Sequence, residues 1–115
     1  GAALMHLGSL GLIGDISPSN FFHIVINNGA HDSVGGQPTI GHDIDFSEIA
    51  INFNYKSTFK VKNHYEITDL IKRSKKIDGP ILIEILTNKG SRRNLGRPTI
   101  KPSDNKLNFM KFLKK

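Results

Sequence analysis

The chain has 115 residues, of which 37% are hydrophobic and 23% charged, and its formal net charge is +6 at pH 7. This length suffices for one domain, or for a piece of one, with a buried core. No apolar run approaches the ~20 residues needed to cross a bilayer, so we expect a soluble protein with no membrane role. The first Lys or Arg is Lys56, so the basic start of a secretory signal is missing and we expect a cytoplasmic protein. The absence of cysteine excludes disulfides, thiolate metal ligands and a cysteine nucleophile.

The positive charge is concentrated in one half of the chain. All 16 Lys and Arg residues lie from Lys56 onward, whereas residues 1–55 contain acidic residues and no Lys or Arg. Either a solvated basic face or a surface that meets an acidic partner domain explains this pattern. A nucleic-acid-binding module is the less favoured alternative, because the basic half lacks interleaved aromatic residues that would stack on bases.

The first third of the chain predicts a helix followed by a strand. Residues 4–13 follow a helical pattern with glycine at every third position, at Gly8, Gly11 and Gly14. Such a glycine face lets another backbone approach closely. Residues 21–26 form a nearly continuous apolar run, which predicts a strand buried on both faces of a parallel sheet.

Two N-capping patterns predict helices in the middle of the chain. Asp45 is the expected N-cap of a helix that ends near Asn54. Asn63 and Glu66 form a second capping pair, and the amphipathic helix that they begin is stopped by the Asp-Gly-Pro sequence at residues 78–80.

The remaining elements are two strands and a terminal helix. Residues 57–62 alternate apolar residues with lysine, which predicts a strand with one wet face near a sheet edge. Residues 81–86 are the most strand-like segment of the chain. A loop rich in Gly and Arg then leads to Ser103, the expected N-cap of a terminal helix. The apolar stripe of this helix consists of Leu107, Met110 and Leu113.

The alternation of strands and helices determines the expected fold class. Strands that are separated by helices form parallel sheets covered on both faces. We therefore expect an α/β fold of three layers, in which a mostly parallel sheet carries helices on both faces.

A long polar loop at residues 27–42 is the most informative segment for function. Ligands of open α/β sheets bind beyond the carboxyl ends of the strands, and Asn27 and Asn28 follow directly after the predicted buried strand. Side-chain amide oxygens can join carboxylate, carbonyl and phosphate oxygens around Mg²⁺. Taken alone, the dipeptide is more typical of the start of a turn.

Three stretches resemble the phosphonopyruvate decarboxylases, a branch of the thiamine-diphosphate-dependent decarboxylase family. Residues 27–39 read NNGAHDSVGGQPT and resemble the corresponding loop of that branch almost residue for residue. Residues 1–10 and 90–99 agree as well, whereas residues 40–88 are similar mainly in pattern. The family carries Gly-Asp-Gly, a helix, and a strand that ends in Asn-Asn. The start of the chain resembles this arrangement with its first two residues missing.

This resemblance implies a thiamine-diphosphate-binding fold that is truncated at its N-terminus. Residues 1–115 would be the C-terminal portion of the domain that binds diphosphate and Mg²⁺. The side chain of Asn28 and the backbone carbonyl of Ala30 would bind Mg²⁺, and Gly1, Ala2 and His31 would contact the cofactor. The third metal ligand, an aspartate, would immediately precede Gly1. The activating glutamate would come from a separate pyrimidine-binding domain, so we expect this chain alone to be inactive and the intact enzyme to be a homo-oligomer.

The reaction implied by the resemblance is the decarboxylation of 3-phosphonopyruvate, a 2-oxo acid, to phosphonoacetaldehyde and CO₂ in phosphonate biosynthesis. Thiamine diphosphate would accept the electrons released with CO₂. His31 and Asp32 would orient substrate or transfer a proton. The alternative is that His31 packs against the cofactor while Asp32 holds the loop through backbone NH groups. Ser33, Arg92 and Arg97 are candidate contacts of the substrate, since a phosphonate requires cations.

Several alternatives stay open at this point. A related enzyme could act on another 2-oxo acid, such as sulfopyruvate. Interface or surface pairing is the commoner use of arginines such as Arg92. His23 lies within an apolar run and is more typical of a core histidine than of a ligand. His42, Asp43 and Asp45 resemble a zinc site only superficially, because no helical ligand spacing supports one.

Overall fold

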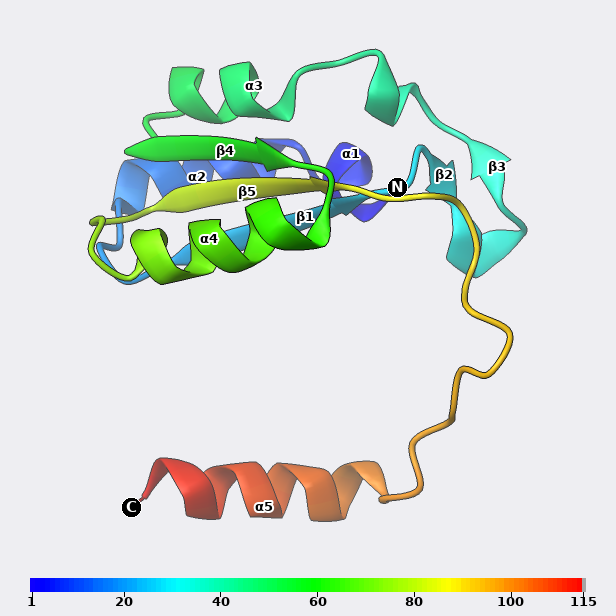
Figure 1. The fold of residues 1–115 in the computed structure, drawn as a ribbon. Coiled ribbons are helices and arrows are strands. Elements are labelled where there is room, and N and C mark those ends of the chain that lie inside the picture. Colours follow the sequence, from blue (N-terminus) through cyan, green and yellow to red (C-terminus); the bar gives the residue numbers. More distant parts are fainter. Residues whose placement is uncertain (115) are drawn as a thin grey trace.

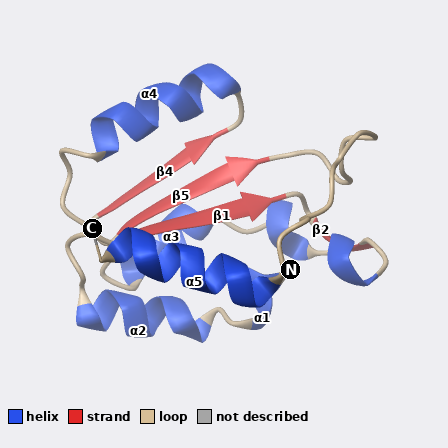
Figure 2. Ribbon diagram, turned by 90° about the horizontal axis from the view of Figure 1, so that it is seen from below, coloured by secondary structure: helices blue, strands red, loops and turns tan. Residues whose placement is uncertain are grey.

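A parallel three-stranded sheet forms the centre of the protein. The computed structural model describes residues 1–114. Strand β5 (Ile81–Leu86) lies between β1 (Phe22–Asn27) and β4 (Ser57–Val61), in the order β1-β5-β4, and both pairs are parallel. The three arrows run in one direction in Figure 2. The two strands predicted at 57–62 and 81–86 are confirmed, and β4 does lie at a sheet edge.

Helices cover both faces of this sheet, which confirms the predicted α/β fold of three layers. Helices α2 (Gly8–Ile16) and α3 (Phe46–Asn52) pack on one face, where Leu10, Phe46 and Leu82 belong to one core cluster. Helix α4 (His64–Ser74) packs on the opposite face, where Leu70 lies against Ile81 in a second cluster. Figure 1 shows α3 and α4 on opposite sides of the sheet.

The two capping patterns predicted in the middle of the chain are present. The carboxylate of Asp45 accepts hydrogen bonds from the backbone N–H groups of Ser47 at 2.8 Å and Glu48 at 3.1 Å. The amide oxygen of Asn63 accepts one from the N–H of Glu66 at 3.0 Å. These bonds satisfy N–H groups that have no partner inside the helix, and they fix where α3 and α4 begin.

The helix predicted over residues 4–13 is two helices. Helix α1 (Ala2–Met5) ends at His6, and α2 follows after tight three-residue backbone bonds from Ser9 to His6 and from Leu10 to Leu7. The close backbone approach predicted for the glycine face is found at Gly14. A Cβ atom at Gly14 would lie 1.5 Å from the carbonyl oxygen of Phe53, so α2 and the end of α3 touch there through backbone.

The prediction that the first strand is buried on both faces was wrong for one face. Val25 is buried against α2 and α3, but Ile24 is 51% exposed and Ile26 is 60% exposed on the other side. The reason is that β1 pairs only with β5 and that α4 covers β5 and β4, so one face of β1 has no cover within residues 1–114.

The loop at residues 27–42 has more structure than the sequence predicted. It contains a two-stranded antiparallel ribbon, β2 (Ala30–His31) with β3 (Gln37–Pro38), and two short 3-10 turns, η1 (Asp32–Val34) and η2 (Ile40–His42). The backbone N–H of Thr39 donates to the carbonyl of Gly29 at 2.8 Å. The loop is therefore a folded ribbon rather than an irregular segment.

The terminal helix α5 (Pro102–Leu113) stands apart from the sheet at the end of the extended connection of residues 87–101 (Figure 1). It begins at Pro102, with Lys101 as its N-cap, so the predicted N-cap Ser103 already lies inside the helix. Proline suits the first helical position because its missing N–H is not needed there. The predicted stripe of Leu107, Met110 and Leu113 is present but exposed. Within residues 1–114, no helix is both long and apolar enough to span a membrane.

His23 is half-buried rather than part of the core, and its ring has a partner inside the protein. Its Nδ1 atom lies 2.9 Å from the hydroxyl oxygen of buried Tyr55, across the α2/α3 side of the sheet. Burial lowers the pKa of His23 and raises the pKa of Tyr55 to about 12, because both side chains lose water that would stabilise their charged forms. This pair ties β1 to the turn after α3.

The contact at Gly14 gives a first prediction. Replacing Gly14 with alanine should lower the free energy of unfolding by about 1–3 kcal/mol, as expected when a side chain is forced into a close-packed contact. Urea unfolding of the two chains measures this difference. Gly8→Ala is the matched control, since a Cβ atom there meets nothing within 4 Å. Equal stability of the Gly14 and Gly8 variants would contradict the contact.

Candidate functional site

The loop that resembles a metal-binding loop lies at the carboxyl end of β1, beside the start of α1. The imidazole of His31 meets Gly1 so closely that a Cβ atom at Gly1 would lie 2.3 Å from Nδ1. The structure therefore brings together two of the predicted cofactor contacts, although 30 positions separate them in the sequence. This is the sheet edge at which α/β proteins bind ligands.

The two adjacent asparagines have different environments. Asn27 is buried, and its Nδ2 atom donates to the carboxylate of Glu84 at 2.6 Å and to the carbonyl of Gly41 at 2.5 Å. Asn28 is only partly buried, and its Oδ1 atom accepts a hydrogen bond from the N–H of Ala30 at 3.1 Å. Each of the two side-chain oxygens accepts one backbone N–H and has a second lone pair. Only Asn28 is partly exposed, so its oxygen can still face a cation.

The side-chain oxygen of Asn28 and the carbonyl oxygen of Ala30 are the kind of ligand that suits a hard cation, which can also bind an anionic ligand. Mg²⁺ prefers oxygen ligands and is often held by a few protein groups together with phosphate oxygens. Asn28 and the carbonyl of Ala30 are neutral, and within residues 1–114 no cluster of three or more His, Cys, Asp or Glu side chains is arranged to hold a metal.

Glycine is required at one position of this loop of residues 27–42, which we call the metal loop because its sequence resembles a metal-binding one. Gly29 has a φ of +65°, and a Cβ atom there would lie 2.5 Å from the ring of His42. A side chain at this position would be strained and would push the ring away. The turn between Asn28 and Ala30 is therefore built for close approach of the backbone.

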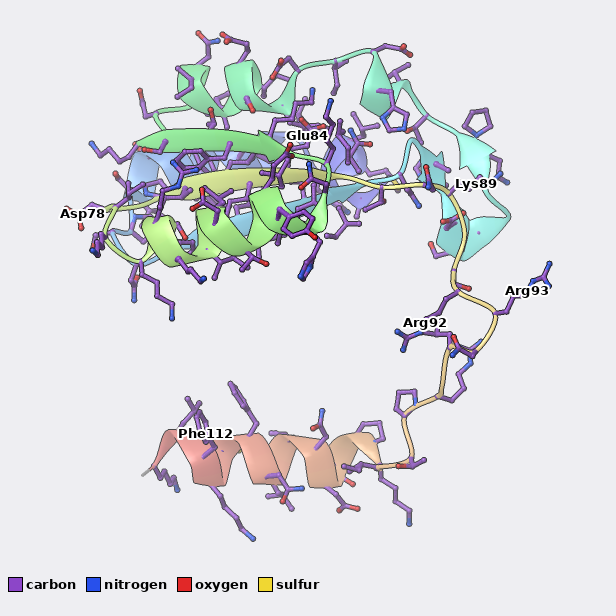
Figure 3. All side chains as sticks on the ribbon, viewed as in Figure 1. Asp78, Glu84, Lys89, Arg92, Arg93 and Phe112 are labelled. Atoms are coloured by element: carbon purple, nitrogen blue, oxygen red, sulfur yellow. The ribbon has the colours of Figure 1, made fainter. Side chains whose placement is uncertain are left out.

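Asp32 links the metal loop to the connection that follows β5. Its Oδ2 atom accepts hydrogen bonds from Nδ2 of Asn28 at 2.6 Å and from the N–H of Gly90 at 3.0 Å. Next to it, the Lys89 ammonium donates to the carbonyl of Gly36. Figure 3 shows Lys89 beside the β2–β3 ribbon. These contacts are those of a loop-holding aspartate, one of the two roles considered for Asp32, and they fix the orientation of the Asn28 amide.

The other predicted site residues lie at different distances from this loop. His31 is half-buried against Gly1, and Ser33 is exposed on the first 3-10 turn. Arg92 and Arg97 are exposed in the connection of residues 87–101. In Figure 3 the side chain of Arg92 points away from the metal loop. The structure does not bring Arg92 or Arg97 to the loop, and their role in binding substrate stays a prediction.

A cavity of about 350 Å³ adjoins the site. It runs along the unpaired edge of β1, between this strand and the first two helices, and its lining includes Gly1, Ile24, Ile26 and Asn27. Asn28 and Ala30 do not line it, whereas Gly1, Ala2 and Asn27 do. The predicted metal ligands Asn28 and Ala30 therefore lie at the loop and not in the cavity.

Sequence reasoning missed one residue of this site, Glu84. It lies in the middle of the apolar strand β5 and is 0% exposed. The sequence of the strand, ILIEIL, carried the signal, because a charged residue inside an apolar strand is rarely buried without a partner. Its ion-pair partner Lys60 is one of the lysines that alternate with apolar residues in the neighbouring strand.

Comparison with known proteins points to the same family as the loop. The chain is 34% identical over 113 residues to the phosphonopyruvate decarboxylase of Streptomyces viridochromogenes, covering 98% of the chain and 28% of that protein. It is also 34% identical over 112 residues to the enzyme of Streptomyces hygroscopicus, with 97% and 28% covered. The chain is a homologue of one segment of the phosphonopyruvate decarboxylases. It spans little more than a quarter of their length.

A more distant relative is the beta subunit of a sulfopyruvate decarboxylase. The protein from Methanococcus maripaludis is 28% identical over 117 aligned positions, which cover 100% of the chain and 61% of the relative. No protein-family model matches the chain. Both sets of relatives are named decarboxylases, and over nearly the whole chain the phosphonopyruvate decarboxylases are the more similar.

The hydrogen bond between the carboxylate of Asp32 and the N–H of Gly90 gives a second prediction. Asp32→Ala should speed the hydrogen exchange of the Gly90 amide several-fold, since this N–H loses its charged acceptor. Exchange measured by NMR or mass spectrometry tests this. Asp43→Ala is the control, because Asp43 is exposed and its carboxylate contacts neither strand end. Unchanged exchange at Gly90 in the Asp32 variant would show that the contact does not hold the loop.

Proposed function

We propose that the chain is the C-terminal portion of the domain that binds diphosphate and Mg²⁺ in a thiamine-diphosphate-dependent phosphonopyruvate decarboxylase. One observation carries this proposal: the side-chain oxygen of Asn28 is presented at the carboxyl end of β1, in a loop that also contacts Gly1 at the start of α1. The homology to phosphonopyruvate decarboxylases over nearly the whole chain supports it.

In this proposal each residue of the loop has a separate task. Asn28 binds Mg²⁺ through its side chain and Ala30 through its backbone carbonyl, while Gly1 and Ala2 let the diphosphate approach the N-terminus of α1. The cofactor, when bound, supplies the electron sink for the loss of CO₂. Asp32 keeps the Asn28 amide in place through the hydrogen bond between Nδ2 and its carboxylate.

His31, Asp32 and Ser33 are the groups closest to the reacting end of the substrate in this proposal. His31 lies against Gly1 and is only half-buried, so its ring can meet a ligand. An imidazole can donate or accept a proton near neutral pH. We assign His31 to substrate orientation or proton transfer, and Ser33 to a hydrogen bond with the substrate.

The proposed active site is incomplete in this chain. The glutamate that activates the aminopyrimidine belongs to a separate pyrimidine-binding domain, so the active enzyme requires that domain and is a homo-oligomer. The small-molecule substrate is 3-phosphonopyruvate and the enzyme is cytoplasmic. Sulfopyruvate is the rival substrate, favoured by the sequence similarity to the sulfopyruvate decarboxylase beta subunit.

The metal role of Asn28 gives a third prediction, for a complete enzyme that carries this segment. Asn28→Ala should raise the dissociation constant of thiamine diphosphate with Mg²⁺ by more than the ~10–100-fold that follows loss of an outer-shell partner. Isothermal titration calorimetry measures this constant. Asn94→Ala, at an exposed asparagine of the connection, should bind like the wild type. Tight binding by the Asn28 variant would remove this residue from the metal site.

The substrate assignment gives a fourth prediction. Arg97→Ala in the complete enzyme should raise the KM for phosphonopyruvate roughly tenfold, as expected for loss of one charged hydrogen bond, and should change kcat less. Steady-state kinetics with phosphonopyruvate and sulfopyruvate measure both constants. Arg73→Ala is the control, because Arg73 pairs with Asp69 on the surface of α4. An unchanged KM would exclude Arg97 from substrate binding, and faster turnover of sulfopyruvate by the wild type would exclude the phosphonate assignment.

A further inference from the structure

Glu84 is a charged residue where a parallel sheet normally holds an apolar one. It lies in the central strand β5, directly across from Val25 of β1 and Lys60 of β4, and it is 0% exposed. Its side chain points to the face covered by α2 and α3, as that of Leu82 does. Figure 3 shows Glu84 within the sheet, toward the end that carries the metal loop.

The two oxygens of Glu84 have different partners. Oε1 accepts the 2.6 Å hydrogen bond from Nδ2 of Asn27. Oε2 lies 3.2 Å from the ammonium of Lys60, which is close enough for an ion pair, yet it has no well-aligned hydrogen-bond donor among the described residues. The carboxylate is thus oriented by Asn27 and neutralised by Lys60, whose own side chain is 40% exposed.

Stability alone gives a weak reason for this arrangement. Taking a carboxylate and an ammonium out of water is costly, and replacing a buried ion pair with apolar residues is often neutral or stabilising. A strand of Ile and Leu residues packs well without a charge. The carboxylate lies next to the buried Asn27 amide, where the metal loop begins. This position explains the buried charge better than stability does.

Asn27 links Glu84 to both ends of the loop through hydrogen bonds. While Nδ2 donates to Glu84 and to the carbonyl of Gly41, its Oδ1 atom accepts a hydrogen bond from the N–H of Gly29 at 3.1 Å. The space around this amide is tight, because a Cβ atom at Gly41 would lie 2.8 Å from Oδ1. One buried amide therefore holds the first and the last turn of the loop.

We propose that Glu84 is a positioning residue for the metal loop. Its carboxylate fixes the Asn27 amide so that Asn28 and Ala30 present their oxygens in one arrangement before the cation arrives, and Lys60 supplies the countercharge. Glu84 itself touches neither metal nor cofactor. This inference rests on the proposed function, and it adds a residue from a different strand to the machinery of the same site.

The test uses a complete enzyme that carries this segment, and it compares two replacements of Glu84. Glu84→Leu removes the acceptor for Asn27, whereas Glu84→Gln keeps an oxygen at the same distance. We expect Glu84→Leu to raise the dissociation constant of Mg²⁺ with thiamine diphosphate about 10–100-fold, as for other outer-shell partners of metal ligands, and Glu84→Gln to restore most of the affinity. In the apo protein, hydrogen exchange at the Gly29 amide should speed up in the Leu variant and stay slow in the Gln variant.

Ile83→Val is the matched control for a general loss of packing. Ile83 is buried on the same strand but faces α4, so this variant should lower stability without changing cofactor affinity or exchange at Gly29. If Glu84→Leu fails to fold, Asn27→Ala breaks the same hydrogen bond from the other side and should raise the dissociation constant at least as much, because it also removes the bonds to Gly29 and Gly41.

Three results would overturn the inference. Cofactor affinity that is equal in the wild type and Glu84→Leu would refute it, as would failure of Glu84→Gln to restore the affinity. Unchanged exchange at Gly29 in the apo Leu variant would refute the link between strand and loop. A wild-type enzyme that bound no thiamine diphosphate would refute the proposed function first, and the inference with it.

Discussion

The side-chain amide of Asn27 is the contact on which the candidate site depends. It is buried at the end of β1, where it bonds to β5 through Glu84 and to both ends of the following loop through Gly29 and Gly41. These bonds hold the backbone at the end of β1, so the next residue, the partly exposed Asn28, faces outward at a fixed position. An unpaired amide at this depth would destabilise the loop, so the site and the sheet are coupled through this one group.

The two faces of β1 have different environments, and one of them supports the loop. One face of the strand packs under α2 and α3, which keeps the loop beside the start of α1. On the other face, Ile24 and Ile26 are exposed, and a cavity follows the unpaired strand edge. Exposed apolar patches are common where a protein meets another molecule, and this chain spans about a quarter of the length of its relatives.

Much of the fold was predictable because local patterns and tertiary packing agree. The capping residues Asp45 and Asn63 mark the starts of α3 and α4, and the strand at residues 81–86 was found from its apolar run. The predictions failed where the outcome depends on distant contacts. No local signal says that one face of β1 is uncovered, or that α2 breaks from α1 at His6. In the loop, the sequence indicated the Asn28 position, but the support from Glu84 and Lys89 required residues more than 50 positions away.

The most direct test of this account is a crystal structure of a complete enzyme that carries this segment, with thiamine diphosphate and Mn²⁺ in place of Mg²⁺. Anomalous scattering locates Mn²⁺ without reference to the protein. We predict one Mn²⁺ ion bound to the side-chain oxygen of Asn28 and to the carbonyl oxygen of Ala30, and shared with the diphosphate. A Mn²⁺–diphosphate site elsewhere, with the Asn28 amide unliganded, would contradict the account.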